Sequence, residues 1–302
     1  MTNTTLRSAF DEQWTRWQRS VDACRDRLGH GAVHALRVGS RRLLSLLDLV
    51  RELTDVPRKA DERVAATLRS LLDALGPLRD AQNERHRVKR ARDGAGIEPL
   101  RRHLKQQGGR YKRPARHAVA HAAGARVRND GARLRAAIVA GASAAAPAEG
   151  HSRLAKAVDR AAADVRSRLA HLDVARPRSV HRLRIALREF RYVVEIATRL
   201  SPGVDVSGQA TVRALQRRLG RAHDAEVLLD RLDRFVRRHP EDAGAALLAL
   251  RRTLSAERNR QLAGLTGALP TLDAALSAAA PAPTAAARRR TRSPSVDPDR
   301  PS

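Results

Sequence analysis

One eleven-residue pattern occurs twice in this chain, and it constrains the fold more than any other feature of the sequence. The first copy runs from Val33 to Leu43, and the second runs from Val180 to Phe190, 147 residues later. Both copies read V-H-x-L-R-[VI]-x-x-R-x-[LF]. The apolar spacing predicts that each copy forms a helix, and its recurrence predicts a second, similar half of the molecule.

Each predicted helix has a basic face opposite an apolar face. At about 100° per residue, His34, Arg37 and Arg41 fall within an arc of roughly 60°, and Arg42 lies about 80° from His34. The apolar face of the first copy comprises Val33, Leu36, Leu43, Leu47 and Val50. In the second copy the basic face holds His181, Arg184, Arg188, Arg191 and Tyr192, and the apolar face holds Val180, Leu183, Phe190, Val194 and Ala197. We interpret the basic face as the functional one and the apolar face as core.

Two further elements recur at nearly the same separation. Leu75-Gly76 followed by Asp80 returns 144 residues later as Leu219-Gly220 followed by Asp224, and Leu-Arg-Arg-x-Leu occurs at 100–104 and again at 250–254. No segment alternates β-branched and polar residues as a strand would. The sequence therefore predicts an all-α fold of two homologous antiparallel helical bundles, an internal duplication related by a pseudo-two-fold axis.

Glycines, prolines and apolar periodicity predict where the helices and domains begin and end. We expect a single domain over 1–270, made of repeats 5–140 and 151–270 joined by an Ala/Pro/Gly-rich linker at 141–150. Residues 278–302 are predicted to be a disordered basic tail. The predicted helices are 5–28, 32–53, 58–75, 78–92, 97–140 with interruptions, 151–173, 178–200, 207–219, 222–238 and 242–266.

The charge balance indicates a polyanionic partner. The chain has 59 Lys and Arg residues against 32 Asp and Glu, a formal net charge of +27, and such an excess repels itself in a compact state. Aromatic residues make up 2% of the chain, which disfavours binding by stacked bases. A single cysteine, Cys24, excludes an internal disulfide and a Cys-rich zinc site. With no long apolar run and no signal segment, we expect a cytoplasmic protein without membrane insertion.

The paired motifs resemble those of the CHAD family, the conserved-histidine α-helical domain. The resemblance rests on His34-x-x-Arg37-Val38-x-x-Arg41-Arg42-Leu43, on His181-x-x-Arg184-Ile185-x-x-Arg188-x-Phe190-Arg191-Tyr192-x-x-Glu195, and on the two Leu-Gly elements. It extends over nearly all of residues 5–270. It implies an all-helical domain of two repeats that binds inorganic polyphosphate on a basic surface or cavity, and an association with polyphosphate granules.

The resemblance and the basic faces together give a set of expected binding residues. The polyphosphate-binding residues are His34, Arg37, Arg41, Arg42, His181, Arg184, Arg188 and Arg191, and the supporting residues are Tyr192, Arg79, Asp80, His223 and Asp224. Neither motif has a second metal ligand at the required spacing, so we expect no metal and no cofactor. Leu44 and Glu189 stand where a basic residue is common in the family, and Arg79 of the first Leu-Gly element is replaced by His223 in the second. These departures put equal contributions from the two halves in question.

Several roles stay open at the level of sequence. His34 and His181 are either partly buried residues that set helix register or cationic donors to phosphate, in which case affinity rises as pH falls. Tyr192 either packs or bonds a phosphate oxygen. Asp80 and Asp224 are either first-turn acids of a helix or acids that orient a motif arginine or histidine.

Two other functions compete with polyphosphate binding. The net charge and the Arg288–Arg292 run permit nonspecific nucleic-acid binding. The H-x-L-R core also occurs in histidine phosphotransfer helices, which would make a motif histidine a phosphoacceptor. No nucleophile constellation, glycine-rich phosphate loop or metal-ligand set is present, so we expect no enzyme and no catalytic residues. The sequence does not fix the oligomeric state.

Overall fold

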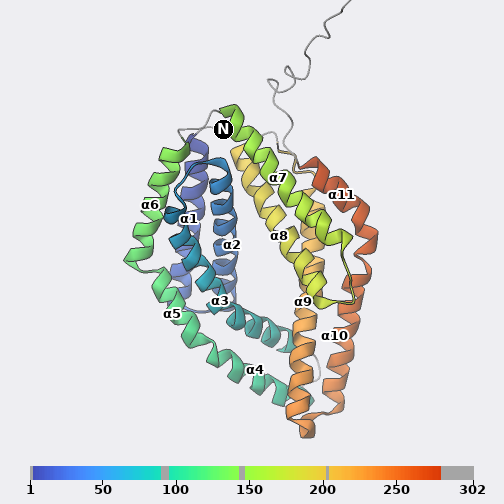
Figure 1. The fold of residues 1–302 in the computed structure, drawn as a ribbon. Coiled ribbons are helices and arrows are strands. Elements are labelled where there is room, and N and C mark those ends of the chain that lie inside the picture. Colours follow the sequence, from blue (N-terminus) through green and yellow to red (C-terminus); the bar gives the residue numbers. More distant parts are fainter. Residues whose placement is uncertain (1–2, 90–94, 143–146, 202–203, 280–302) are drawn as a thin grey trace, which may run out of the picture.

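The computed structural model is built from helices (Figure 1). It describes residues 3–89, 95–142, 147–201 and 204–279, and every regular element within these ranges is helical, which confirms the predicted all-α class. The α-helices are α1 (Asn3–Asp26), α2 (His30–Leu53), α3 (Arg58–Lys89), α4 (Glu98–Arg110), α5 (Lys112–Ala122), α6 (Ala125–Ala142), α7 (Pro147–Ala170), α8 (Pro177–Leu200), α9 (Gln209–Arg238), α10 (Ala245–Ala263) and α11 (Leu269–Ala278). Short 3-10 turns occupy Ala95–Ile97 (η1), Pro240–Asp242 (η2) and Thr266–Ala268 (η3).

The two motif copies begin one turn into α2 and α8 and occupy their N-terminal and middle parts. Every residue predicted for their apolar faces is buried, which confirms the predicted orientation of both helices. Pro177 is at the start of α8, where its missing backbone N–H leaves no helical hydrogen bond unmade. Burying one stripe of each helix leaves the His/Arg stripe on the opposite side.

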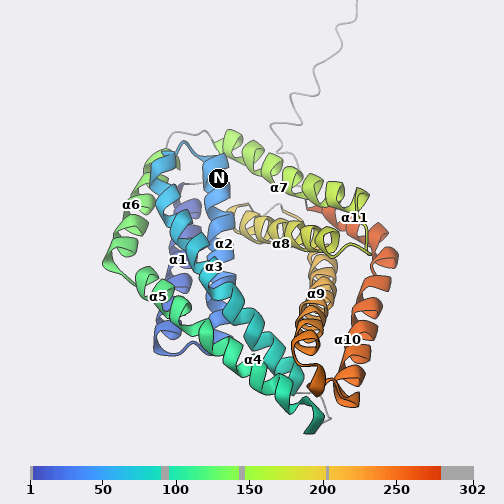
Figure 2. The ribbon, with the colours of Figure 1, turned by 60° about the horizontal axis from the view of Figure 1, so that its bottom comes forward.

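The order of neighbouring helices is the same at the start of each half. Helix α2 lies between α1 and α3, and α8 lies between α7 and α9. After that the halves differ: α4 and α5 return along α3 and α6 packs on α1, whereas α10 runs along α9 and α11 contacts α7 and α9 (Figures 1 and 2). This arrangement is compatible with duplication followed by divergence, and the duplication itself stays a prediction.

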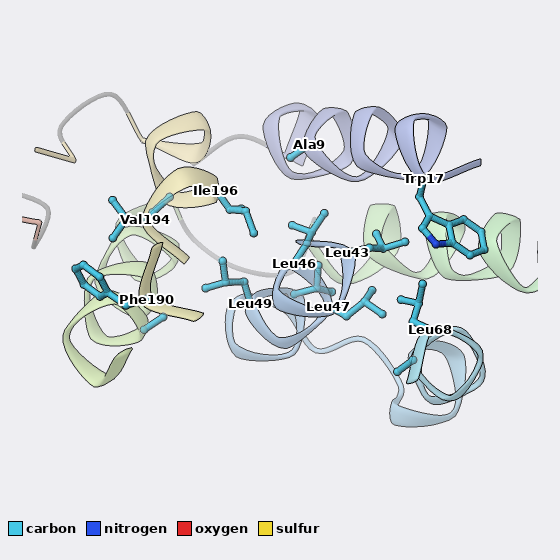
Figure 3. Packing of buried hydrophobic residues seen from close by; sticks show 14 of the residues in the cluster. Ala9, Trp17, Leu43, Leu46, Leu47, Leu49, Leu68, Phe190, Val194 and Ile196 are labelled. Atoms are coloured by element: carbon cyan, nitrogen blue, oxygen red, sulfur yellow. The ribbon is translucent and has the colours of Figure 1, made fainter. Parts of the chain in front are cut away.

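One continuous core joins the two halves. Leu46 and Leu49 of α2 belong to the same buried cluster as Ala9 of α1 and Ile196 of α8 (Figure 3), and this cluster extends into both halves. Burial of so much apolar surface is the main term that holds the halves together. A second, smaller cluster joins η1 and the ends of α3 and α4 to α9 and α10. The halves therefore meet at two places, around α2 and α8 and at the far ends of α3 and α9.

Two helices are longer than the sequence predicts. The expectation of separate helices at 58–75 and 78–92 is wrong, because α3 continues through Gly76 and Pro77. Proline removes one helical hydrogen bond and disturbs the preceding turn. In that turn the Leu72 carbonyl accepts a hydrogen bond from Arg37 Nη1 at 2.6 Å. The expected break at 220–221 is also wrong, since α9 is continuous.

The remaining differences concern element ends. Pro147 to Gly150, expected in the linker, begin α7, and α11 follows the last predicted helix. The 97–140 region is three helices, separated at Tyr111 and at Ala123-Gly124. Residues 143–146 of the linker and residues 280–302 of the predicted tail are outside the described residues. Among the described residues, no helix is both long enough and apolar enough to span a membrane.

Candidate functional site

The basic faces of α2 and α8 meet in the middle of the molecule. Arg37 and Arg41 on α2 face Arg184 and Arg188 on α8, and each of these arginines is half-buried. The chain brings four guanidinium groups together because α2 and α8 pack against each other with their motif stripes on the same side. The structure thus joins the two copies of the motif into one cluster, which we call the central arginine cluster.

The central arginine cluster is electrostatically unfavourable on its own. Burial, together with the charges of Arg188, Arg37 and Arg184, lowers the pKa of Arg41 to about 9. Burial and Arg188 likewise lower the pKa of Arg37 and of Arg184. Arg41 forms no hydrogen bond or ion pair with any described residue, and the Nε atom of Arg184 is buried without a partner. Like charges held together in this way are stabilised by an anion placed among them.

Two aspartates from the Leu-Gly elements border the central arginine cluster. Desolvation raises the pKa of Asp80 and of Asp224, and the nearby arginines, Arg184 and Arg79 among them, oppose that rise. Both aspartates lie in the interior of a long helix, so the interpretation as first-turn acids is wrong. Glu189, 3.6 Å from Arg188, and Asp73, near Arg37, add two more negative charges at the border of the cluster, so the carboxylates partly offset the repulsion among the guanidinium groups.

His34 extends the basic surface away from the central arginine cluster. Its pKa is lowered by desolvation and by the charges of Arg79, His30 and the two α2 arginines of the cluster. Arg79 Nη1 donates to the His30 carbonyl at 3.0 Å, and the His30 ring stacks on His86 with centroids 5.5 Å apart. His34 is exposed to solvent, as is Asp80, so the cluster is open to solvent on this side.

His181 occupies the matching position on the other side of the central arginine cluster. Desolvation comes first among the causes that lower its pKa, followed by the charges of Arg184, Arg188 and Arg41. Its ring lies 5.2 Å from the ring of His223 on α9, measured between centroids. Burial, together with Arg184 and His181, lowers the pKa of His223 to about 4. His223 is therefore neutral at physiological pH.

Arg42 and Arg191, which lie at the edge of the basic faces, form a separate group in which both arginines are paired with one carboxylate. Arg42 donates to Glu195 at 3.1 Å, and Arg191 lies 3.7 Å from the same carboxylate. Their guanidinium groups lie over the buried ring of Tyr192, at 5.7 Å and 4.8 Å from its centroid. These residues link α2 to α8 and hold charges that already have partners. Tyr192 packs between them, which favours its structural interpretation.

A cavity of about 400 Å³ adjoins the central arginine cluster on the α8 side. It lies between the start of α8, α9 and α10, and it shares His181, Arg184 and His223 with the site already described. Most of its remaining wall is apolar. The other lining residues are Val174, Ala175, Pro177, Val180, Ala222, Glu226, Arg258, Asn259, Leu262 and Ala263.

A strongly basic groove of about 650 Å³ adjoins His30 and His86 on the other side. It runs between the α1–α2 turn, α3, α4 and the start of α5, and Asp26 and Glu98 are the two acidic residues that line it. We call it the basic groove. Its cationic side chains are Arg25, Arg27, Arg85, Lys89, Arg101, Arg102, Lys105, Lys112 and Arg116.

A metal-ligand set occurs among the described residues at the α9–α10 turn. The ligand atoms of His239, Glu241 and Asp242 lie within 4.8 Å of one another. These three residues are not part of the walls of the cavity or of the basic groove. That the two motifs themselves hold no metal is still a prediction.

Some residues of the site escaped the sequence analysis. His30 lies one turn before His34 on the same helix face, a spacing of four that could have been noticed. The basic groove and the α8–α9–α10 cavity combine residues far apart in the chain, and no local pattern signals them.

Fold and site together define an all-helical protein whose two histidine-arginine motifs converge on one half-buried basic cluster. A family model for the CHAD domain matches residues 8–207, and the chain belongs to this family. The expected family membership is thereby confirmed.

Two solved structures are similar in fold to this chain. The crystal structure of the CHAD domain from the plant Ricinus communis has a TM-score of 0.64 and 20% identity, covering 93% of both chains. PptA from Streptomyces chartreusis has a TM-score of 0.61 and 18% identity, covering 91% of this chain and 99% of that one. A comparison with curated proteins gave no match.

Proposed function

We propose that this protein is a non-enzymatic binding protein for inorganic polyphosphate, held at the central arginine cluster. The observation that carries the proposal is the convergence of Arg37, Arg41, Arg184 and Arg188 from two helices, with Arg41 unpaired among the described residues. Burial and, after it, mutual repulsion lower the pKa values of Arg37, Arg41 and Arg184, and a polyanion placed there relieves the repulsion. Guanidinium groups also bind phosphate oxygens in bidentate fashion.

The dimensions of the site favour a thin phosphate chain over nucleic acid. Positions three or four residues apart on a helix present their side chains roughly 5–6 Å from one another, a spacing suited to neighbouring phosphates of a flexible chain. The four guanidinium groups are half-buried between α2 and α8, where a stiff, wide duplex does not reach. The resemblance to CHAD proteins, set out from the sequence, implies the same ligand and an association with polyphosphate granules.

Further basic residues continue the site towards the basic groove. His34, Arg79, His30 and His86 lie between the central arginine cluster and that groove. A long chain bound at the cluster therefore has a cationic path along α3. Counterion release from a chain neutralised at many phosphates makes the affinity fall steeply with salt.

A competition between two polymers tests this function. Long-chain polyphosphate and a DNA duplex of equal charge concentration are titrated against the wild type near physiological salt, with folding checked by circular dichroism. We expect a preference for polyphosphate that is lost when Arg37, Arg41, Arg184 and Arg188 are all changed to Met. The matched control changes four exposed arginines outside the cluster and the basic groove to Met: Arg19, Arg58, Arg213 and Arg260.

The control variant has the same net charge as the cluster variant. It should keep the preference for polyphosphate, with a modest uniform loss of affinity for both polymers. Equal binding of both polymers by the wild type, or equal losses in the two variants, would mean that the protein is a diffuse polycation that binds nucleic acid as readily.

A further inference from the structure

The cavity between α8, α9 and α10 has a wall that a phosphate polymer does not explain. Val180 and Ala222 are buried in that wall, Leu262 is partly buried, and Val174 at the rim is 46% exposed. Val174 is one of three large apolar side chains that are exposed among the described residues. Inorganic polyphosphate has no apolar surface to place against these side chains. The cavity therefore fits a ligand with an apolar or aromatic part.

The polar end of the same cavity is continuous with the central arginine cluster. His181, Arg184 and His223 line the cavity, and Arg184 also faces Arg188. The Nε atom of Arg184 is buried without a hydrogen-bond partner. A ligand that occupies the apolar part can thus extend an anionic group to Arg184.

Arg258 supplies a flat and fixed surface in the cavity. Its Nη1 donates to Glu226 at 2.9 Å, and its Nε and Nη2 both donate to the Asn259 side-chain oxygen at 3.2 Å. All three guanidinium nitrogens donate hydrogen bonds within the protein, so the planar guanidinium group of Arg258 is held in one orientation and is not a free phosphate ligand. A guanidinium plane held in this way stacks well on a planar heteroaromatic ring.

The remaining polar groups suit the edge of such a ring. The Asn259 side-chain nitrogen donates to no described residue, so its two N–H groups remain available to acceptors on a ligand. His223, neutral at physiological pH, offers one donor and one acceptor nitrogen beside the apolar wall. A volume of about 400 Å³ is within the range of small-molecule sites.

We propose that this cavity binds a nucleoside polyphosphate, with the base between Arg258 and the apolar wall and the phosphates on Arg184 and the central arginine cluster. The phosphate end rests on the proposed function, because it uses the same arginines. The base end is independent of that function. Nucleotide and inorganic polyphosphate then compete for the arginines, so the binding of one lowers the apparent affinity for the other.

Calorimetric titrations with ATP and with inorganic tripolyphosphate test the proposal. Both ligands carry three linked phosphates, only ATP carries a base, and EDTA keeps divalent metal ions out of both titrations. We expect the wild type to bind ATP about tenfold more tightly than tripolyphosphate. Ala263→Phe places a large ring at an exposed position of the cavity wall, and Asn259→Ala removes both the free amide and the oxygen that holds the Arg258 guanidinium.

Both variants should bind ATP no more tightly than tripolyphosphate while binding tripolyphosphate as the wild type does. Ala249→Phe is the matched control, since Ala249 is an exposed position of the same helix outside the cavity, and it should keep the ATP preference. Equal wild-type affinities for the two ligands, or a preference that survives in Ala263→Phe, would overturn the proposal. A separate titration of the same proteins with long-chain polyphosphate tests the proposed function. If long-chain polyphosphate does not bind while the preference for ATP is observed, the proposed function is wrong and the proposed base site is still supported.

Discussion

Adjacent arginines in the first motif have opposite roles in stability. Arg41 is half-buried among like charges and makes no hydrogen bond with a described residue, whereas Arg42 is bonded to Glu195 and lies over Tyr192. Holding Arg41 unpaired among like charges costs the folded state free energy, and a bound anion would relieve that repulsion. Arg42 lies away from the centre of the basic stripe, which is why it meets a carboxylate.

Replacing these two arginines should therefore change stability in opposite directions. Arg41→Met removes repulsion and should raise the free energy of unfolding of the ligand-free protein by about 1 kcal/mol, while Arg42→Met removes a bonded partner of Glu195 and should lower it by about 1 kcal/mol. Polyphosphate affinity should fall about tenfold in Arg41→Met alone. Chemical denaturation and a binding titration measure both effects. A destabilised Arg41→Met protein would show that this arginine holds the fold together.

The motif histidines should make polyphosphate binding depend on pH. The free protein holds the pKa of His34 and of His181 below the usual value of about 6.5, first through desolvation and then through neighbouring cations. A bound polyanion stabilises the protonated rings and raises both pKa values, so binding takes up protons and strengthens as pH falls. The charged or titratable neighbours are Arg37, Arg41, Arg79 and His30 for His34, and Arg41, Arg184, Arg188 and His223 for His181.

The expected gain in affinity is roughly tenfold between pH 7.5 and pH 5.5, and it should level off once both rings are protonated in the free protein. The double variant His34→Asn, His181→Asn should lose most of this pH dependence, with His30 and His86 as the remaining histidines on the proposed path. Titrations at constant ionic strength measure the profile. A double variant with the wild-type pH profile would exclude these two histidines as its source.

At the scale of elements, a buried ion pair connects the two long helices. Glu84 of α3 is 2% exposed and lies 3.4 Å from the Arg231 guanidinium of α9. Burial raises the pKa of Glu84 and Arg231 opposes that rise, so desolvation outweighs attraction at this carboxylate. A pair of this kind costs more to break than it contributes when intact.

Removing one partner of this pair should destabilise more than replacing both. Glu84→Ala should lower the free energy of unfolding by about 3 kcal/mol, because it leaves Arg231 uncompensated. Glu84→Leu combined with Arg231→Met should recover most of that loss. Asp233→Ala, which breaks the exposed pair with Arg251, is the control and should cost less than about 1 kcal/mol. Urea denaturation of the four proteins is the measurement, and a double variant as unstable as Glu84→Ala would contradict the argument.

Some features of the helices can be predicted from the local sequence, and others depend on tertiary packing. The three- and four-residue spacing in α2 and α8 predicts their buried faces correctly, because that spacing is a property of each helix alone. Pro77 predicts a helix end wrongly, because packing of α3 against α2 and α5 outweighs one lost hydrogen bond. The spacing of apolar residues over Leu269–Ala278 does not predict α11, because this helix is short and only weakly amphipathic.

The candidate site shows the same division. The motif spacing identifies the arginine faces, but it does not reveal that both faces meet, since α2 and α8 are brought together by tertiary packing. Asp80 and Asp224 follow Leu-Gly pairs that resemble helix ends, and only the continuity of α3 and α9 places them beside the arginines. The cavity walls formed by α9 and α10 cannot be predicted from either segment alone, because the cavity exists only when the two helices pack together.

On the scale of the whole molecule, the basic residues form an extended surface with one deep centre. The central arginine cluster leads past His34 and His30 to the basic groove, whose exposed cations include Arg85, Lys89 and Arg102. If polyphosphate binds at the cluster as proposed, we expect a short chain to fill the cluster alone and a long chain to contact the groove as well. Each added phosphate contact releases further counterions, so affinity should rise with chain length until both regions are occupied.

Changing the three groove cations should therefore remove the dependence on length without weakening the binding of short chains. We expect the Arg85→Ala, Lys89→Ala, Arg102→Ala triple variant to bind tripolyphosphate as the wild type does and long chains about tenfold more weakly, with a shallower salt dependence. The matched triple variant Arg19→Ala, Arg58→Ala, Arg213→Ala carries the same net charge and should keep the wild-type length dependence. Titrations with size-fractionated polyphosphate at several salt concentrations measure these affinities. If both triple variants lose affinity for long chains equally, overall charge and not the groove determines how affinity depends on chain length.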